Sequence, residues 1–136
     1  TPMADTLVDS NVILDIVTED PNWFEWSSAQ LIQAADQGNL IINPIIYAEI
    51  SIGFTQIEEL DAALPPDFFQ RQPLPWNAAF LAGKAFLQYR QLGGDRRSPL
   101  PDFYIGAHAV ILGIPLLTRD VNRYQTYFPE LQLITP

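Results

Sequence analysis

The chain has 136 residues, of which 48% are hydrophobic and 17% charged, and it contains no Cys. This length suits one domain and the apolar content suffices for one core, so a single domain over residues 1–136 is predicted. The composition excludes intrinsic disorder, a disulfide scaffold and any metal site built on Cys.

Charge is unevenly distributed along the chain. The net charge is −9, and residues 1–70 hold 12 of the 16 Asp and Glu residues but none of the 7 Lys and Arg residues. An acidic chain is a poor coat for nucleic acid, although it could act on nucleic acid through a bound cation. The longest uncharged apolar run, residues 103–117, is too short for a membrane span, and no export signal is visible, so a cytoplasmic protein without a membrane partner is expected.

Hydrophobic periodicity predicts alternating strands and helices. In chain order we expect a strand at 6–8, a helix carrying Val12, Ile13 and Ile16, a helix from Asn22 or Trp23 to Gly38, a strand at 40–42, a helix from Asn43-Pro44 to Ile52, a short helix at 56–64, an edge strand or extended loop at 68–74, a long helix at 76–92, a helix at 102–112, a strand at 115–118, a short helix at 122–127 and a last strand at 131–134. Strands separated by helices favour a parallel sheet with helices on both faces. In such α/β folds ligands bind beyond the carboxyl ends of the strands.

Three carboxylates fall near that edge. Asp9 ends the first strand, and Asp120 lies two residues beyond the strand 116–118. Asp102 begins the preceding helix, where 100° per residue places it on the inward stripe. Its neighbours on that stripe are Ile105, Gly106 and Ala109.

A fourth carboxylate, Glu49, interrupts an apolar helix face. The hydrophobic pattern reserves its position for the core, which counts as an error unless the residue is functional. The face is formed by Ile45, Ile46, Ile52 and Gly53.

Burying several anions together is costly unless protons or cations compensate. A shared proton is one possibility, but a set of oxygen donors fits a hard divalent metal better, so Mg²⁺ or Mn²⁺ is predicted. Zinc is disfavoured because the chain has one His and no Cys. His108 lies about 120° around its helix from Asp102 and is predicted to be structural.

Other chemistries fit the sequence less well. Gly83-Lys84 lies inside a helical pattern, so it is no Walker A loop. Ser10 could be a nucleophile only beside a base; otherwise Ser10 and Asn11 cap the first helix or support the acids. A receiver-type phosphoacceptor domain normally needs a Lys after the last strands, whereas the only Lys here is Lys84.

Four segments carry the acids in a fixed order. They are Val8-Asp9-Ser-Asn-Val-Ile13, Asn43-Pro-Ile-Ile-Tyr-Ala-Glu49-Ile with Gly53, Leu100-Pro-Asp102-Phe-Tyr-Ile-Gly-Ala-His-Ala109, and Leu116-Leu-Thr118-Arg-Asp120 followed by Tyr124 and Phe128. Together they resemble the motifs of the PIN-domain nucleases and, within that family, of the VapC-type toxins of bacterial toxin–antitoxin pairs. The resemblance nearly spans the chain, apart from residues 58–76, which match no family motif.

The resemblance implies a three-layer α/β/α sandwich with a central parallel sheet and a Mg²⁺- or Mn²⁺-dependent endoribonuclease. The residues that it marks as metal-binding and catalytic are Asp9, Glu49, Asp102 and Asp120. It marks Ser10 and Thr118 as supporting or substrate-binding residues.

Partners follow from charge and from the family. Arg96, Arg97, Arg119 and Arg123 are candidates to contact RNA phosphates, although Arg119 could equally pair with an acid. Family members are usually homodimers, and an antitoxin with a basic tail would neutralise the acidic site, with Trp23 and Trp26 either binding it or lying in the core. The alternative function is a weakly active or inactive PIN-like binding module.

Overall fold

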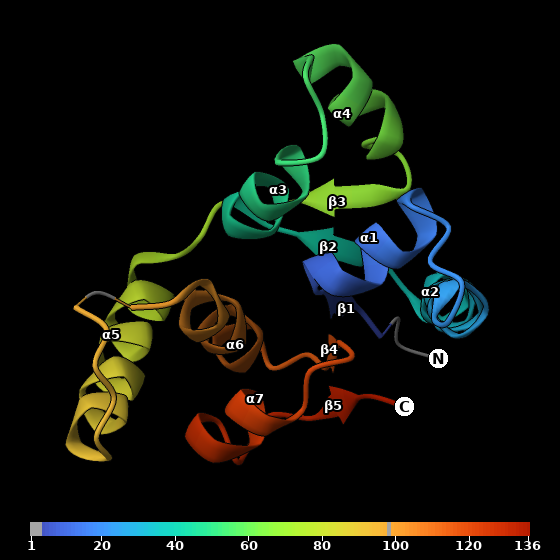
Figure 1. Ribbon diagram of the computed structural model, residues 1–136. Helices are drawn as coiled ribbons and strands as arrows, with labels where there is room; N and C mark the ends of the chain where they lie inside the picture. Colours follow the sequence, from blue (N-terminus) through green and yellow to red (C-terminus); the bar gives the residue numbers. More distant parts are fainter. Residues whose placement is uncertain (1–3, 98) are drawn as a thin grey trace.

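The computed structural model describes residues 4–97 and 99–136, in which one or two helices separate consecutive strands (Figure 1). In chain order the elements are β1 (Thr6–Val8), α1 (Ser10–Val17), α2 (Phe24–Gln37), β2 (Leu40–Ile42), α3 (Pro44–Ser51), α4 (Ile57–Ala63), β3 (Phe69–Arg71), α5 (Trp76–Gln91), α6 (Pro101–Leu112), β4 (Leu116–Leu117), α7 (Asn122–Tyr127) and β5 (Leu133–Ile134). The predicted order is confirmed, and the ambiguous segment 68–74 contains a strand. The largest boundary error is in this segment, because β3 ends at Arg71, three residues before the expected end at residue 74.

The strands form one parallel sheet in the order β3-β2-β1-β4-β5. β1 is central, because Leu7 lies opposite Ile41 of β2 on one side and opposite Leu116 of β4 on the other. Every residue of β1 and β2 is buried, as expected for parallel strands covered on both faces. The central position of β1 brings the residue after it, Asp9, within reach of elements on both sides.

Helices pack on both faces of the sheet and give a three-layer α/β/α sandwich (Figure 1). α1 contacts α2 and α3, whereas α6 contacts α5, α7 and α3. Among the described residues, no helix combines the length and the apolar character that a bilayer crossing requires.

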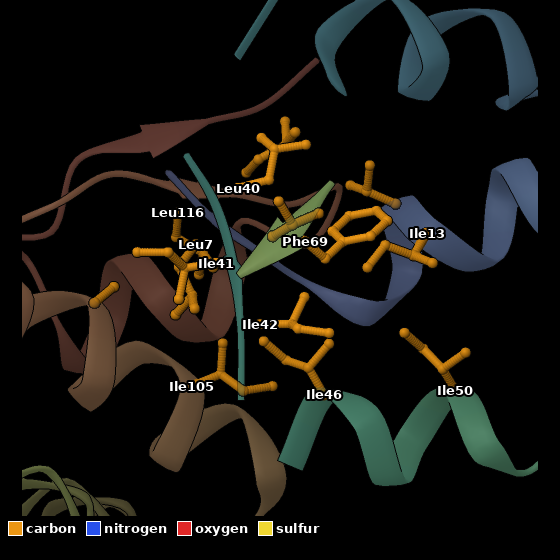
Figure 2. Close-up of a cluster of buried hydrophobic side chains, with 14 of the residues drawn as sticks. Leu7, Ile13, Leu40, Ile41, Ile42, Ile46, Ile50, Phe69, Ile105 and Leu116 are labelled. Carbon is orange, nitrogen blue, oxygen red and sulfur yellow. The ribbon is translucent and has the colours of Figure 1, made fainter. Parts of the chain in front are cut away.

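The core lies between the sheet and its helices (Figure 2). Leu7 and Ile41 of the sheet are at most 1% exposed, and Ile46 of α3 and Ile105 of α6 are fully buried. Each such side chain contributes about 1.5–3 kcal/mol on burial. The helices that carry Glu49 and Asp102 are therefore anchored in the core through Ile46 and Ile105.

Both ends of α6 are defined by local sequence. Pro101 occupies the first turn, where its missing N–H costs nothing, and Gly113 ends the helix in the left-handed region with φ +67°. Within the helix, a Cβ on Gly106 would lie 2.6 Å from the Phe128 ring. Only Gly allows this close approach of α6 to the segment after α7.

Candidate functional site

Asp9 is the most buried carboxylate of the predicted set, with 3% of its surface exposed. It follows β1 and caps α1, where Oδ1 accepts the N–H of Ser10 at 2.7 Å. Its Oδ2 accepts hydroxyl protons from Thr118 and Tyr124, both at 2.9 Å. Three donors from β1–α1, the end of β4 and α7 therefore fix one carboxylate at the carboxyl edge of the sheet.

Glu49 reaches the same edge from α3. The Ser10 hydroxyl lies 2.9 Å from Glu49 Oε1, to which it donates, and 3.5 Å from Asp9 Oδ1. The reason given for Glu49 from the sequence was wrong in part: Ile46 is buried, but Ile52 is 86% exposed, so the face is not a core face throughout. The helix ends at Ser51, which leaves Ile52 beyond it.

Asp102 approaches Asp9 across the Tyr124 hydroxyl, which lies 3.5 Å from Asp102 Oδ1. Its other oxygen is 3.7 Å from the Arg123 guanidinium. That guanidinium lies over the rings of Tyr89 and Phe103, at 5.8 and 5.6 Å from their centroids. Stacking thus holds a cation at the flank of Asp102.

Asp120 is the most exposed of the four predicted acids. It follows β4 in the loop 118–121, and its backbone N–H donates to Thr118 Oγ1 at 3.0 Å. The side chain is exposed. Its negative charge raises the pKa of both Asp9 and Asp102, so Asp120 belongs to the same electrostatic group.

The carboxylates resist ionisation, chiefly because they are buried. Burial raises the pKa of Asp9, and the hydrogen bonds from Thr118, Tyr124 and Ser10 oppose this only in part. Burial also raises the pKa of Glu49; the hydrogen bond from Ser10 lowers it, while the charges of Asp9 and Asp102 raise it further.

The same causes act on Asp102. Burial and the charges of Asp9 and Asp120 raise its pKa from 3.8 to about 6, against the opposing effect of Arg123. The pKa of Tyr124 is well above its ordinary value because the hydroxyl is buried among these acids. A cation near these groups would favour their charged forms.

The donor set matches a hard divalent cation, since it consists of carboxylate oxygens supported by hydroxyls. As they stand, however, no three or more of the described His, Asp and Glu residues are arranged to hold a metal ion. Mg²⁺ keeps several of its waters, so it can be held by few direct protein ligands. The residues that could supply them are Asp9, Glu49, Asp102 and Asp120.

The residues predicted to bind substrate divide into three groups. Ser10 and Thr118 are buried and hydrogen-bonded to the acids. Arg96 and Arg97 are exposed in the segment between α5 and α6. The Arg119 guanidinium is paired with Asp15, the alternative that the sequence left open, and the Arg123 guanidinium lies 3.7 Å from Asp102.

His108 has a structural environment, as predicted. It is fully buried, and its Nδ1 lies 3.0 Å from the amide nitrogen of Asn43. Asn43 Oδ1 accepts the N–H of Ile46, so the amide nitrogen donates to His108. Burial lowers the pKa of His108, which keeps the ring neutral.

Sequence reasoning gave no role to Tyr124 and an undecided role to Asn11. Tyr124 is the buried residue of the short helix α7. The available signal was its position in the motif series after Asp120, and its burial explains why its hydroxyl needs a partner. Asn11 donates to Thr118 Oγ1 at 3.1 Å, so it supports the site as well as the start of α1.

The molecule is thus an α/β/α sandwich with a parallel sheet. Four acidic residues, Asp9, Glu49, Asp102 and Asp120, which we call the carboxylate group, lie near the carboxyl edge of its central strands. The PIN domain family model matches residues 6–129. The chain belongs to the PIN domain family.

Solved structures share this fold. A chain of VapBC2 from Rickettsia felis, in a structure bound to a DNA fragment from the VapBC2 promoter, is 18% identical to this chain with a TM-score of 0.75. The match covers 97% of this chain and 98% of the Rickettsia chain. A chain of VapBC-1 from nontypeable Haemophilus influenzae is 20% identical with a TM-score of 0.72 and coverages of 96% and 97%. A chain of a toxin–antitoxin complex from Klebsiella pneumoniae is 19% identical with a TM-score of 0.68 and coverages of 96% and 97%. No curated protein matches the sequence.

Proposed function

We propose that this PIN domain is a Mg²⁺- or Mn²⁺-dependent endoribonuclease. The observation that carries the proposal is the grouping of Asp9, Glu49 and Asp102, which come from three elements and are connected through the hydroxyls of Ser10 and Tyr124. Carboxylates that raise one another's pKa are typical of catalytic sites. The choice of RNA as substrate rests on the resemblance to PIN-domain nucleases.

In this proposal Asp9, Glu49, Asp102 and Asp120 hold the cation. The cation would lower the pKa of a water and stabilise charge on the leaving oxygen of a phosphodiester. Thr118, Ser10 and Tyr124 keep the carboxylates oriented. Arg96 and Arg97 contact the phosphates beside the cut.

The nuclease is proposed to be the toxin of a toxin–antitoxin pair. The structural neighbours support this, because their descriptions name VapBC complexes and a toxin–antitoxin complex. A chain with a net charge of −9 suits an antitoxin with a basic tail. We also propose a cytoplasmic homodimer, in keeping with the family.

The test is cleavage of RNA in Mg²⁺ or Mn²⁺, with and without chelator. Glu49→Gln and Asp102→Asn should lose more activity than the 10–100-fold that loss of a supporting residue typically costs. Asp61→Asn is the matched control, because it removes an acid that pairs with Arg71 on the surface. All variants are purified in parallel with the wild type. Cleavage that persists in chelator and in both site variants would refute the metal-dependent mechanism.

A binding module with weak or no cleavage is the second candidate. It is favoured by the lack, among the described residues, of three ligands already arranged for a metal. Heat denaturation separates the two functions. A nuclease should gain thermal stability from Mn²⁺, whereas a module without a metal site should not.

A further inference from the structure

The Arg119 side chain is held by Asp15 of α1 and by Trp23, the residue before α2. Its Nε and Nη2 donate to Oδ2 and Oδ1 of Asp15 at 2.6 and 2.9 Å, a bidentate arrangement. Asp15 is only 3% exposed, and its Oδ2 also accepts the Ser27 hydroxyl at 2.7 Å. The guanidinium lies 4.9 Å from the centroid of the Trp23 ring. A planar cation therefore fills a site that only Arg satisfies fully.

The backbone of the same residue is held as well. The Arg119 N–H donates to Asn11 Oδ1 at 3.1 Å. Asn11 and Asp15 are four residues apart on α1 and so lie on the same helix face. Residue 119 is thus attached to α1 at two points, one through its backbone and one through its side chain.

Both neighbours of Arg119 are residues of the candidate site: Thr118 is hydrogen-bonded to Asp9, and Asp120 is one of the four acids. Thr118 donates to Asp9 Oδ2 at 2.9 Å and accepts from Asn11 Nδ2 at 3.1 Å and from the Asp120 N–H at 3.0 Å. Asp120 is exposed, so the backbone of residues 118–120 determines where its carboxylate lies.

We infer that Arg119 is a positioning residue: bound to Asp15 and Asn11, it fixes the segment 118–120 against α1 and so places Thr118 and Asp120 beside Asp9. The inference rests on the proposed metal-dependent function. It assigns the Arg119 guanidinium to Asp15 rather than to an RNA phosphate. Arg119 acts through its neighbours and does not touch the reacting atoms.

The test compares two pairs of identical substitutions. The double variant Asp15→Asn/Arg119→Met removes the ion pair without leaving a buried charge, and Asp61→Asn/Arg71→Met removes the exposed pair at 3.0 Å as the control. Arg119→Lys retains the charge without the bidentate geometry. If a single Arg119→Met variant fails to fold, the charge-neutral double variant and Arg119→Lys still decide the question.

Three measurements are made on each folded protein. Calorimetric titration with Mn²⁺ should show a dissociation constant about tenfold higher for the Arg119 variants, as for loss of a supporting residue. Hydrogen exchange of the amides of 119 and 120 should be about tenfold faster, while exchange in α5 is unchanged. With RNA, kcat should fall and KM should stay nearly constant.

Exchange and Mn²⁺ affinity that stay within about twofold of wild type in the double variant would overturn the inference. A higher KM for RNA with unchanged Mn²⁺ affinity would also overturn it, because it would assign Arg119 to the substrate. If the wild-type protein binds no Mn²⁺, the proposed function fails, and amide exchange at 119 and 120 still judges the positioning role.

Discussion

Replacing Asp102 by Asn should stabilise the metal-free protein at neutral pH. The folded protein raises the pKa of this carboxyl from 3.8 to about 6, chiefly by burial. Below 3.8 both folded and unfolded chains hold the proton, so the group has no effect on stability. As pH rises from 3.8 to about 6 the unfolded chain releases its proton first, and the free energy of unfolding therefore falls. Above about 6 the loss is complete.

The magnitude follows from the shift. Two pKa units correspond to about 3 kcal/mol, which is an upper limit. The Asp102 side chain is 26% exposed, so solvent screening reduces the expected gain for Asn to about 1–2 kcal/mol. The weak pairing with Arg123 at 3.7 Å is lost in the variant and offsets little. For a chain of this length the melting temperature should rise by roughly 3–8 °C.

The assay is thermal denaturation in chelator at about pH 4 and about pH 8. Asp102→Asn should melt above wild type at the higher pH, and the difference should shrink at the lower pH. Asp67→Asn is the control, because Asp67 is exposed in the turn before β3. A variant that is no more stable than wild type at about pH 8, or a difference that does not depend on pH, would refute this account of Asp102.

Three further changes test the site and its supports. Mn²⁺ at about 100 times its dissociation constant should raise the free energy of unfolding by about 2.7 kcal/mol in denaturant titrations, and no change would count against a metal site. Gly106→Ala should cost about 1–3 kcal/mol in urea unfolding, because its Cβ would lie 2.6 Å from the Phe128 ring. Gly83→Ala in α5, where a Cβ would have nothing within 4 Å, should instead stabilise the protein by about 1 kcal/mol. If both substitutions changed the free energy of unfolding in the same direction, the packing argument would be contradicted. Tyr124→Phe removes the donor 2.9 Å from Asp9 Oδ2 and should destabilise the protein by about 1–3 kcal/mol at about pH 8; an unchanged unfolding midpoint would show that the bond is dispensable.

The fold was predictable because its signals are local. Runs such as Leu40–Ile42 are short, apolar and bounded by turn residues, while α1 and α2 carry their apolar residues at helical spacing. Asp9 and Asp120 could be placed at one edge because carboxyl ends of parallel strands meet there. Strand β3 stayed ambiguous because it is only three residues long. Phe69 is the one buried residue among them, so the strand has no alternating pattern to detect.

The contacts of the site were less predictable because they depend on tertiary distances. Glu49 was predicted to be functional because it interrupts an apolar helix face. In the structure this face is incomplete, because Ile52 is exposed beyond the end of α3. The pairing of Arg119 with Asp15 joins residues 104 positions apart. Nothing in the spacing of either residue distinguishes this pair from an Arg that contacts phosphate. Only the bidentate geometry against a buried carboxylate decides between them.

The exposure of the acidic side chains increases from Asp9 through Asp102 to Asp120, and this order gives them different tasks. Asp9 is 3% exposed, and its two oxygens already accept hydrogen bonds from three donors. Asp102 is 26% exposed and Asp120 is exposed, so both have oxygens that water or a cation can reach. Under the proposed function, Asp9 is the fixed anion around which the fold is arranged, and the outer carboxylates exchange water for metal. Removing Asp9, unlike removing Asp102, would leave these three donors without their acceptor, so it should disturb folding and metal binding together. Removing Asp120 should weaken metal binding and leave stability nearly unchanged.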